Sequence, residues 1–490
     1  MTETAPVRSF SAAAPDEVSI SCRLPLLVLF LSAAIWLVIG SVLALIASIK
    51  FHSPNFLADS AWLTYGRVRP AFTNSMLYGF CLQAGLGVEL WLLARLGRAP
   101  LAQSGLITLG AALWNLGVTL GIAGVLAGDS TGFETLEMPR YAVVMLFLGY
   151  LLIGVWGALT FHQRRERGLF VSQWFVLAAV FWFPWIYSTA ELLLVARPVR
   201  GVAQSVIAWW YADNLQVVWL GLVGLGAIFY FVPKLLERDL HSHYLALFTF
   251  WTLILFGSWG GVPGTAPVPT WLPTISSVAT VFMGLAMLTV ALNVYPTACA
   301  VLPKTSPSHS RGPRPPVLSF MIFGTGAFII AASMKIAAVL SDPKPVLHFT
   351  WFSTAQNQLH FYGFFAMVMF GAIYYILPQL MGLEFPRPKL VRVHLWLAAG
   401  GIVLIVLPLA IGGIVQGLTL ANPAIAFLDV SKTSLHFLRV STIGDLLLLL
   451  AQLVFLVNLA GLTVSFYRVR AAAAVAAMTA DLFKTAEVKP

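Results

Sequence analysis

Apolar runs of about 20 residues or more, separated by short polar stretches, repeat along the whole chain and constrain its fold more than any other feature. Of the 490 residues, 59% are hydrophobic and 10% are charged. This composition is typical of a polytopic membrane protein and excludes a soluble domain. Because lipid offers no hydrogen-bond partner to the backbone, the runs predict helices rather than open sheets.

We therefore predict an all-α polytopic membrane protein of about twelve transmembrane helices. The predicted helices cover residues 25–48, 71–96, 105–127, 140–162, 173–195, 203–233, 243–260, 274–297, 317–340, 350–379, 393–416 and 437–467. The layout is a cytoplasmic N-terminal segment 1–24, a membrane domain 25–467 and a cytoplasmic tail 468–490. A proline-rich stretch at 303–316 is the clearest linker.

Basic residues concentrate in alternate loops. They are Arg95, Arg98, Arg164, Arg165, Arg167, Lys234, Arg238, Lys304, Arg311, Arg314, Arg387, Lys389 and Arg392, with Arg468 and Arg470 after the last helix. This positive-inside pattern predicts that both termini lie in the cytoplasm and that the protein resides in a bacterial inner membrane. The net charge of +10 is then explained by topology and by contact with anionic lipid, which argues against nucleic acid as a partner.

Two of the predicted helices end in nearly the same sequence. Residues 226–235 read GAIFYFVPKL and residues 371–380 read GAIYYILPQL, which indicates an internal repeat. Aligning these endings places Asp213 over Gln358. Each helix carries polar side chains near its beginning, and polar side chains at membrane depth indicate a functional site.

The residues around these polar groups resemble subunit I of the cbb3-type cytochrome c oxidases, in the heme-copper oxidase family. Residues 209–214 read Trp-Trp-Tyr-Ala-Asp-Asn, where the family has Trp-Trp-Tyr-Gly-His-Asn. Residues 66–74 read Gly-Arg-Val-Arg-Pro-Ala-Phe-Thr-Asn, where the family has Gly-Arg-x-Arg-Pro-x-His-Thr-Asn. Residues 250–264 match a third family motif, and the resemblance, over roughly 50–465, implies the subunit I helix bundle.

The resemblance also implies six heme and copper ligand positions, and none of them holds a histidine in this chain. These positions are Phe72 for the low-spin heme, Asp213, Pro263 and Gly264 for copper, and Gln356 and Gln358 for the two heme irons. Heme iron normally needs an axial nitrogen or sulfur donor, and copper at such a centre prefers imidazole. We therefore expect no bound cofactor, and copper least of all.

Two histidines keep heme b open as an alternative. His360 lies four residues after Gln356 and therefore shares a helix face with it. His436 begins the last predicted helix, and we expect both imidazoles to reach the bundle interior near the matched positions.

Polar residues of the two repeated helices form a second candidate site. They are Asp213, Asn214, Gln216, Gln356, Asn357 and Gln358. We expect them to converge, because the resembled family packs these two helices against one centre. Such a network either joins the helices through hydrogen bonds of roughly 1 kcal/mol each, or binds a small molecule or a proton at Asp213.

Three functions follow from these alternatives. The first is a subunit of a respiratory or electron-transfer complex that lacks an oxygen-reducing heme-copper centre and is not catalytic by itself. Its partners would be lipid and other membrane subunits, among which the resemblance implies a membrane-anchored c-type cytochrome. The second is a heme-binding oxidoreductase that uses His360 or His436. The third is a membrane protein that handles lipid, quinone or protons in the cavity left by the missing ligands.

Overall fold

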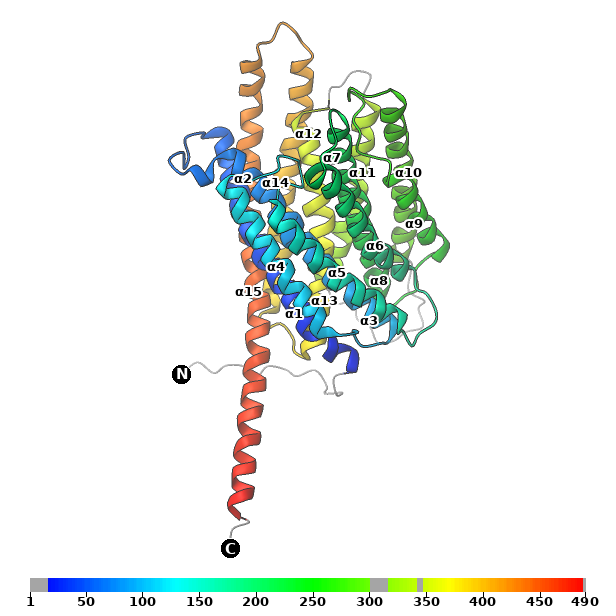
Figure 1. The fold of residues 1–490 in the computed structure, drawn as a ribbon, viewed down its shortest axis with the longest axis vertical. Coiled ribbons are helices and arrows are strands. Elements are labelled where there is room, and N and C mark those ends of the chain that lie inside the picture. The colour runs from blue at the N-terminus through cyan, green and yellow to red at the C-terminus, as the bar shows by residue number, and fades with distance from the viewer. Residues whose placement is uncertain (1–15, 300–315, 342–346, 488–490) are drawn as a thin grey trace.

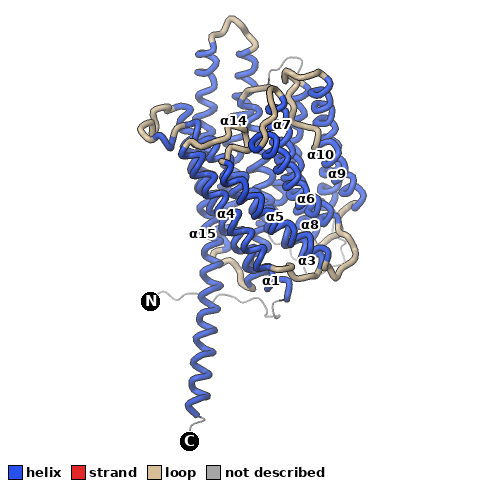
Figure 2. The backbone as a smooth tube through the Cα atoms, viewed as in Figure 1, coloured by secondary structure: helices blue, strands red, loops and turns tan. Residues whose placement is uncertain are grey.

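The structure, a computed structural model, describes residues 16–299, 316–341 and 347–487. Within these ranges the regular secondary structure is helical and there is no β-strand (Figure 2). The predicted all-α class is therefore confirmed. The predicted linker at 303–316 falls almost entirely outside the described residues.

Eleven helices of the described ranges are long and apolar enough to cross a membrane. They are Glu17–His52 (α1), Tyr65–Gly97 (α2 and α3), Ser104–Ala127 (α4), Arg140–His162 (α5), Val171–Ala196 (α6 and a π-helical end), Ala203–Leu236 (α7 and α8), Trp271–Cys299 (α10), Pro316–Leu340 (α11), Trp351–Met381 (α12 and α13), Pro388–Leu420 (α14) and Phe427–Thr479 within α15. The twelfth predicted helix corresponds to α9, His243–Gly257, which is apolar but shorter. Each predicted span falls on one of these helices.

The helices run roughly along one common direction, so the bundle has two ends (Figure 1). We call the end at which α1 begins the N side and the opposite end the far side. The α14–α15 hairpin projects beyond the other helices on the far side, and α15 projects from the N side toward the C-terminus (Figure 1). Because α15 is continuous over Phe427–Glu487, the predicted tail 468–490 begins as an extension of the last helix.

Three helices form the centre of the bundle, and each contains a π-helical segment. These central helices are Tyr65–Gly97, Ala203–Leu236 and Trp351–Met381, and their apolar windows are 100%, 83% and 83% buried. The π segments are Ser75–Cys81, Asn214–Trp219 and Leu359–Ala366. π-bulges interrupt the regular hydrogen-bond ladder of an α-helix and are frequent at functional sites.

The internal repeat also includes the π-helical segments of two central helices. The 145-residue offset that separates Gly226 from Gly371 also separates Asn214 from Leu359, where the two π segments begin. The repeat therefore includes the local geometry that positions Asp213 and Gln358, which directly precede the two segments.

Polar side chains also link the helices inside the bundle. Ser32 Oγ of α1 donates to Gln83 Oε1 of α3 at 2.6 Å, and Asn115 Nδ2 of α4 donates to the same oxygen at 2.8 Å. Gln83 is fully buried. Because these hydrogen bonds join side chains of three helices, they hold the helices in one relative register.

Close backbone contact joins α4 and α5. A Cβ atom at Gly149 would lie 2.9 Å from Trp114 N and 3.0 Å from Gly110 O, both of which are backbone atoms. We expect Gly149→Val to separate these helices and destabilise the protein by about 1–3 kcal/mol, the usual cost of overpacking. Thermal unfolding of the purified protein measures this loss. The matched control is Gly400→Val in α14, where no atom lies within 4 Å of the added Cβ, and an equal loss there would contradict the prediction.

Candidate functional site

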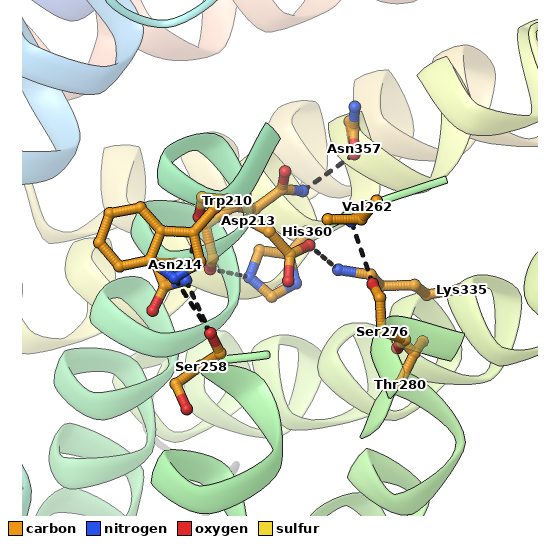
Figure 3. A network of polar contacts seen from close by, with 11 residues as sticks. Trp210, Asp213, Asn214, Ser258, Val262, Ser276, Thr280, Lys335, Asn357 and His360 are labelled. Atoms are coloured by element: carbon orange, nitrogen blue, oxygen red, sulfur yellow. Dashed lines mark hydrogen bonds and ion pairs between the residues drawn. The ribbon is translucent and has the colours of Figure 1, made fainter. Parts of the chain in front are cut away.

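A charge pair occupies the centre of the candidate site. Asp213, the last residue of α7 (Ala203–Asp213), forms an ion pair with Lys335 of α11 (Figure 3). Asp213 is 9% exposed and the Lys335 side chain is 26% exposed. Lys335 is not among the residues predicted for this site. The signal that could have identified it is a lone cation near the end of an otherwise apolar helix.

The ion pair borders a cavity of about 250 Å³ on the far side, which we call the Asp213 cavity. Its lining includes Asp213, Gln216, Pro263, Gly264, Lys335, His348, Gln356 and Asn357. Four of the six matched ligand positions therefore meet at one cavity, as the resemblance implies. His348 also borders the cavity, and its buried Nδ1 has no hydrogen-bond partner among the described residues.

The loop that follows α9 closes one side of this cavity. Trp210 Nε1 and Asn214 Nδ2 both donate to the backbone oxygen of Ser258, each at 3.2 Å (Figure 3). Gly261 has a φ of +101°, and a Cβ atom there would lie 2.7 Å from Asp213 Cβ. Only glycine adopts this backbone conformation at such close approach, so Gly261 fixes the loop against the helix that carries Asp213.

The six predicted polar residues do not form one network. Gln216 Nε2 donates to Asn357 Oδ1 at 3.0 Å, and this bond joins two of the central helices. Asn214 points elsewhere, because its Oδ1 accepts from Trp182 Nε1 of α6 at 3.3 Å. Gln356 faces the Asp213 cavity, whereas Gln358 faces the other cavities. The predicted convergence therefore holds only for part of the set.

Phe72 and Gln358, the other two matched positions, also meet at one cavity. This second cavity has a volume of about 40 Å³ and is bordered by Arg69, Phe72, Gln358 and Asp445. A third cavity of about 130 Å³ touches Phe72 and Gln358 on one side and Gln216 on the other. The matched positions thus lie along a row of cavities in the far half of the bundle.

The two candidate histidines have different surroundings. His360 is 5% exposed and borders a small cavity together with Asp213 and Gln356. Its Nε2 lies 2.9 Å from the backbone oxygen of Gln216, within the π segment of the neighbouring helix. Nε2 therefore carries the proton and Nδ1 the lone pair. His436 is exposed on α15, so the expectation that it reaches the bundle interior is wrong.

A buried carboxyl group lies in the loop between α4 and α5, next to the row of cavities. Burial raises the pKa of Glu137 to about 7, and the hydrogen bond from Asn74 Nδ2, at 2.7 Å, lowers that pKa only in part. Glu134 and Thr135 of the same loop border the third cavity. This loop therefore places a group that titrates near neutral pH at the far end of the site.

A helix bundle of this size, with three bulged central helices and a charge pair between one of them and α11, defines a polytopic membrane protein that keeps polar groups inside the bundle. The family described as Cytochrome C and Quinol oxidase polypeptide I matches residues 25–447. Because this match covers most of the chain, the protein belongs to that family.

Individual relatives agree with the family match. The chain is 25% identical to a cytochrome c oxidase subunit 1 homolog of Azorhizobium caulinodans over 452 residues, which are 87% of this chain and 80% of that protein. It is 27% identical to cytochrome c oxidase subunit 1 of Rhodobacter capsulatus, over 88% of this chain and 83% of that protein. It is 23% identical to the cbb3-type cytochrome c oxidase subunit CcoN1 of Stutzerimonas stutzeri, over 78% of this chain and 81% of that protein. The predicted subunit I-like, cbb3-type resemblance is thus confirmed.

These comparisons correct the expectation that the chain carries no cofactor, which is wrong. The chain belongs to the family of heme-copper oxidase subunit I. It aligns with about 80% of the length of relatives that are named as cytochrome c oxidase subunits. The absence of histidine at six matched positions is therefore no ground for excluding heme or copper.

The described residues fit a heme group better than they fit a copper centre. Heme needs one axial donor, and His360 supplies a buried imidazole at the edge of the cavities. Copper in the resembled family needs several imidazoles at one place. No three His, Cys, Asp or Glu side chains of the described part gather in a way that could hold a metal ion. These residues do not fit a copper centre of that kind.

The ion pair itself is open to a direct test. Lys335→Met leaves the Asp213 carboxylate buried without its partner, and breaking a buried pair in this way costs about 3 kcal/mol. We expect the double variant Asp213→Asn/Lys335→Met to regain most of this stability, because no unpaired charge then stays buried. Chemical denaturation of the single and double variants measures both effects. A double variant less stable than Lys335→Met would contradict this account.

Proposed function

We propose that the protein acts as the subunit I-like membrane subunit of a respiratory electron-transfer complex in a bacterial inner membrane. Its family match and its relatives' names, each of which describes an oxidase subunit, support this role. The concentration of basic residues in loops at the N side supports an orientation with both termini in the cytoplasm. Its partners are lipid and other membrane subunits, among them a membrane-anchored c-type cytochrome.

We further propose that proton handling at the pair of Asp213 and Lys335 is the task of the Asp213 cavity. The observation that carries this proposal is a carboxylate and an ammonium group, from two different helices, facing one polar cavity. A proton that reaches Asp213 neutralises the carboxylate and releases Lys335 from its partner. Because Lys335 is 26% exposed, its ammonium group has access to water from the far side.

Polar side chains that can hydrogen-bond water continue from this pair. Gln216 and Asn357 border both the Asp213 cavity and the third cavity. The loop that carries Glu137, whose pKa is about 7, lies beside the third cavity. Groups with pKa values near the working pH are suited to accept and release protons.

Proton flux tests this proposal. In vesicles that contain the purified protein and a pH-sensitive dye, we expect Asp213→Asn to reduce voltage-driven proton flux to the level of empty vesicles, because the amide cannot take up the proton. The control is Asp59→Asn, which changes the same functional group at an exposed position on the far side. If Asp213→Asn folds normally and conducts as well as the unaltered protein, the proposal fails.

His360 favours a second function, the binding of heme b in an oxidoreductase. It is the buried imidazole next to Asp213 and Gln356, and its Nδ1 keeps a lone pair that an iron atom can accept. Heme, when bound, supplies a one-electron carrier. The chain's own contribution is the axial nitrogen and a position fixed by the hydrogen bond to Gln216.

Visible absorbance tests the second function. We expect the purified protein to show a Soret band that His360→Ala removes, and the exposed His436→Ala to keep that band as a matched control. A purified protein without a Soret band, or a band that survives His360→Ala, rules out this assignment. Loss of proton flux in Asp213→Asn does not depend on either result, so the two functions are tested separately.

A further inference from the structure

A large cavity lies at the N side, at the end of the bundle opposite to the Asp213 cavity. Its volume is about 800 Å³. It is formed by the start of α1, the ends of α3 and α8, and the loop between α5 and α6. Its lining residues are Asp16, Glu17, Val18, Arg95, Leu96, Arg98, Arg165, Phe170, Tyr230 and Lys234. We call it the N-side cavity, and neither proposed function uses it.

The lining of the N-side cavity has an excess of positive charge. It contains four cationic side chains and two carboxylates, which gives a formal charge of +2. Arg95 lies 2.8 Å from Asp16 and Arg165 lies 3.2 Å from Glu17, so the two carboxylates hold two of the cations in place. Lys234 has no ion pair within the described part of the chain. Its ammonium group is therefore available to an anion.

Backbone hydrogen bonds attach the loop between α5 and α6, which forms one side of this cavity, to the end of α3. The backbone oxygen of Gly97, at the end of α3, accepts hydrogen bonds from the N–H groups of Arg165 at 2.9 Å and Glu166 at 3.3 Å. The neighbouring Arg164 turns away, with its guanidinium 4.2 Å from the centre of the Phe161 ring. The loop therefore directs Arg165, rather than Arg164, into the N-side cavity.

Arg98, another cation of the lining, has an unusual backbone conformation. It follows the last residue of α3 with a φ of +49°, in the left-handed region that favours glycine at this position of a helix end. A non-glycine residue in this conformation costs roughly 1 kcal/mol. Arg98 is the fourth cation of the lining; its Nε lies 3.8 Å from Glu166 Oε2, and its side chain is 77% exposed.

We propose that the N-side cavity binds a ligand that carries an anionic phosphate group. Phosphate is the anion that clustered arginine and lysine side chains recognise best, by charge and by multiple hydrogen bonds. Basic pockets between membrane helices on the cytoplasmic side bind the headgroups of anionic lipids. The apolar wall of Leu96, Phe170 and Tyr230 suits the acyl chains of such a lipid. The same cations also suit free phosphate.

Binding measurements with the full chain test this proposal and distinguish the two sources of phosphate. The probes are soluble short-chain phosphatidylglycerol, short-chain phosphatidylcholine and inorganic phosphate, each titrated into the purified protein. We expect phosphatidylglycerol to bind more tightly than phosphatidylcholine. Equal or tighter binding of inorganic phosphate would instead identify a free phosphate as the ligand, and would support the same site.

The binding of two double variants is compared. Arg95→Gln/Lys234→Gln removes two cations from the cavity and should weaken binding roughly 30-fold, at about 5-fold for each cation. Arg387→Gln/Lys389→Gln removes the same charge from an exposed stretch at the start of α14, also on the N side, and should leave binding unchanged. Equal weakening in both variants, or no binding of either anion, would overturn the proposal.

A third variant covers the case in which the first does not fold. Asp16→Asn/Glu17→Gln removes the two carboxylates that compete for Arg95 and Arg165, and should therefore tighten binding. Unchanged or weaker binding in a folded protein of this kind would contradict the site.

Discussion

Lipid offers no hydrogen-bond partner, and this constraint favours polar side chains of the bundle that pair with one another. A buried charge needs a partner inside the protein, and Asp213 finds it in Lys335. Neutral side chains follow the same rule. Tyr374 lies 3.0 Å from His394 Nδ1 and accepts a hydrogen bond from Asn458 Nδ2 at 3.2 Å, which joins three helices. Polar contacts therefore fix how the helices are placed against each other.

The same constraint explains how much the sequence could predict. An apolar run long enough to cross the membrane has one backbone solution, so all twelve predicted spans fall on observed helices. The motif alignment also places side chains correctly at a coarse level, since Phe72 and Gln358 share one cavity while Asp213, Gln356 and Gly264 share another. Repeats and flanking motifs carry register over long distances.

Partners across the bundle could not be predicted from local patterns. Lys335 lies 122 residues from Asp213, and nothing in an apolar helix indicates which neighbour a lone cation will face. His436 was misplaced for a related reason. Polar and apolar residues are spread around the last helix, so its sequence does not define which face is buried, and His436 is exposed. The expectation of no cofactor was wrong for another reason. It rested on the missing histidines at the matched positions, although the chain belongs to the family.

The helix Ala203–Leu236 connects the two sites, and its length relates them to the membrane. Asp213 and Lys234 are 21 residues apart on this helix, which corresponds to roughly 30 Å at 1.5 Å per residue, about the thickness of the hydrocarbon layer. The Asp213 cavity and the N-side cavity therefore lie at opposite boundaries of that layer, where charged groups can reach water. Between them the helix presents only uncharged residues, and beyond the π segment Asn214–Trp219 the α-helical backbone of Leu220–Leu236 satisfies its own hydrogen bonds. Charge is thus concentrated where it can exchange with the aqueous phase on each side.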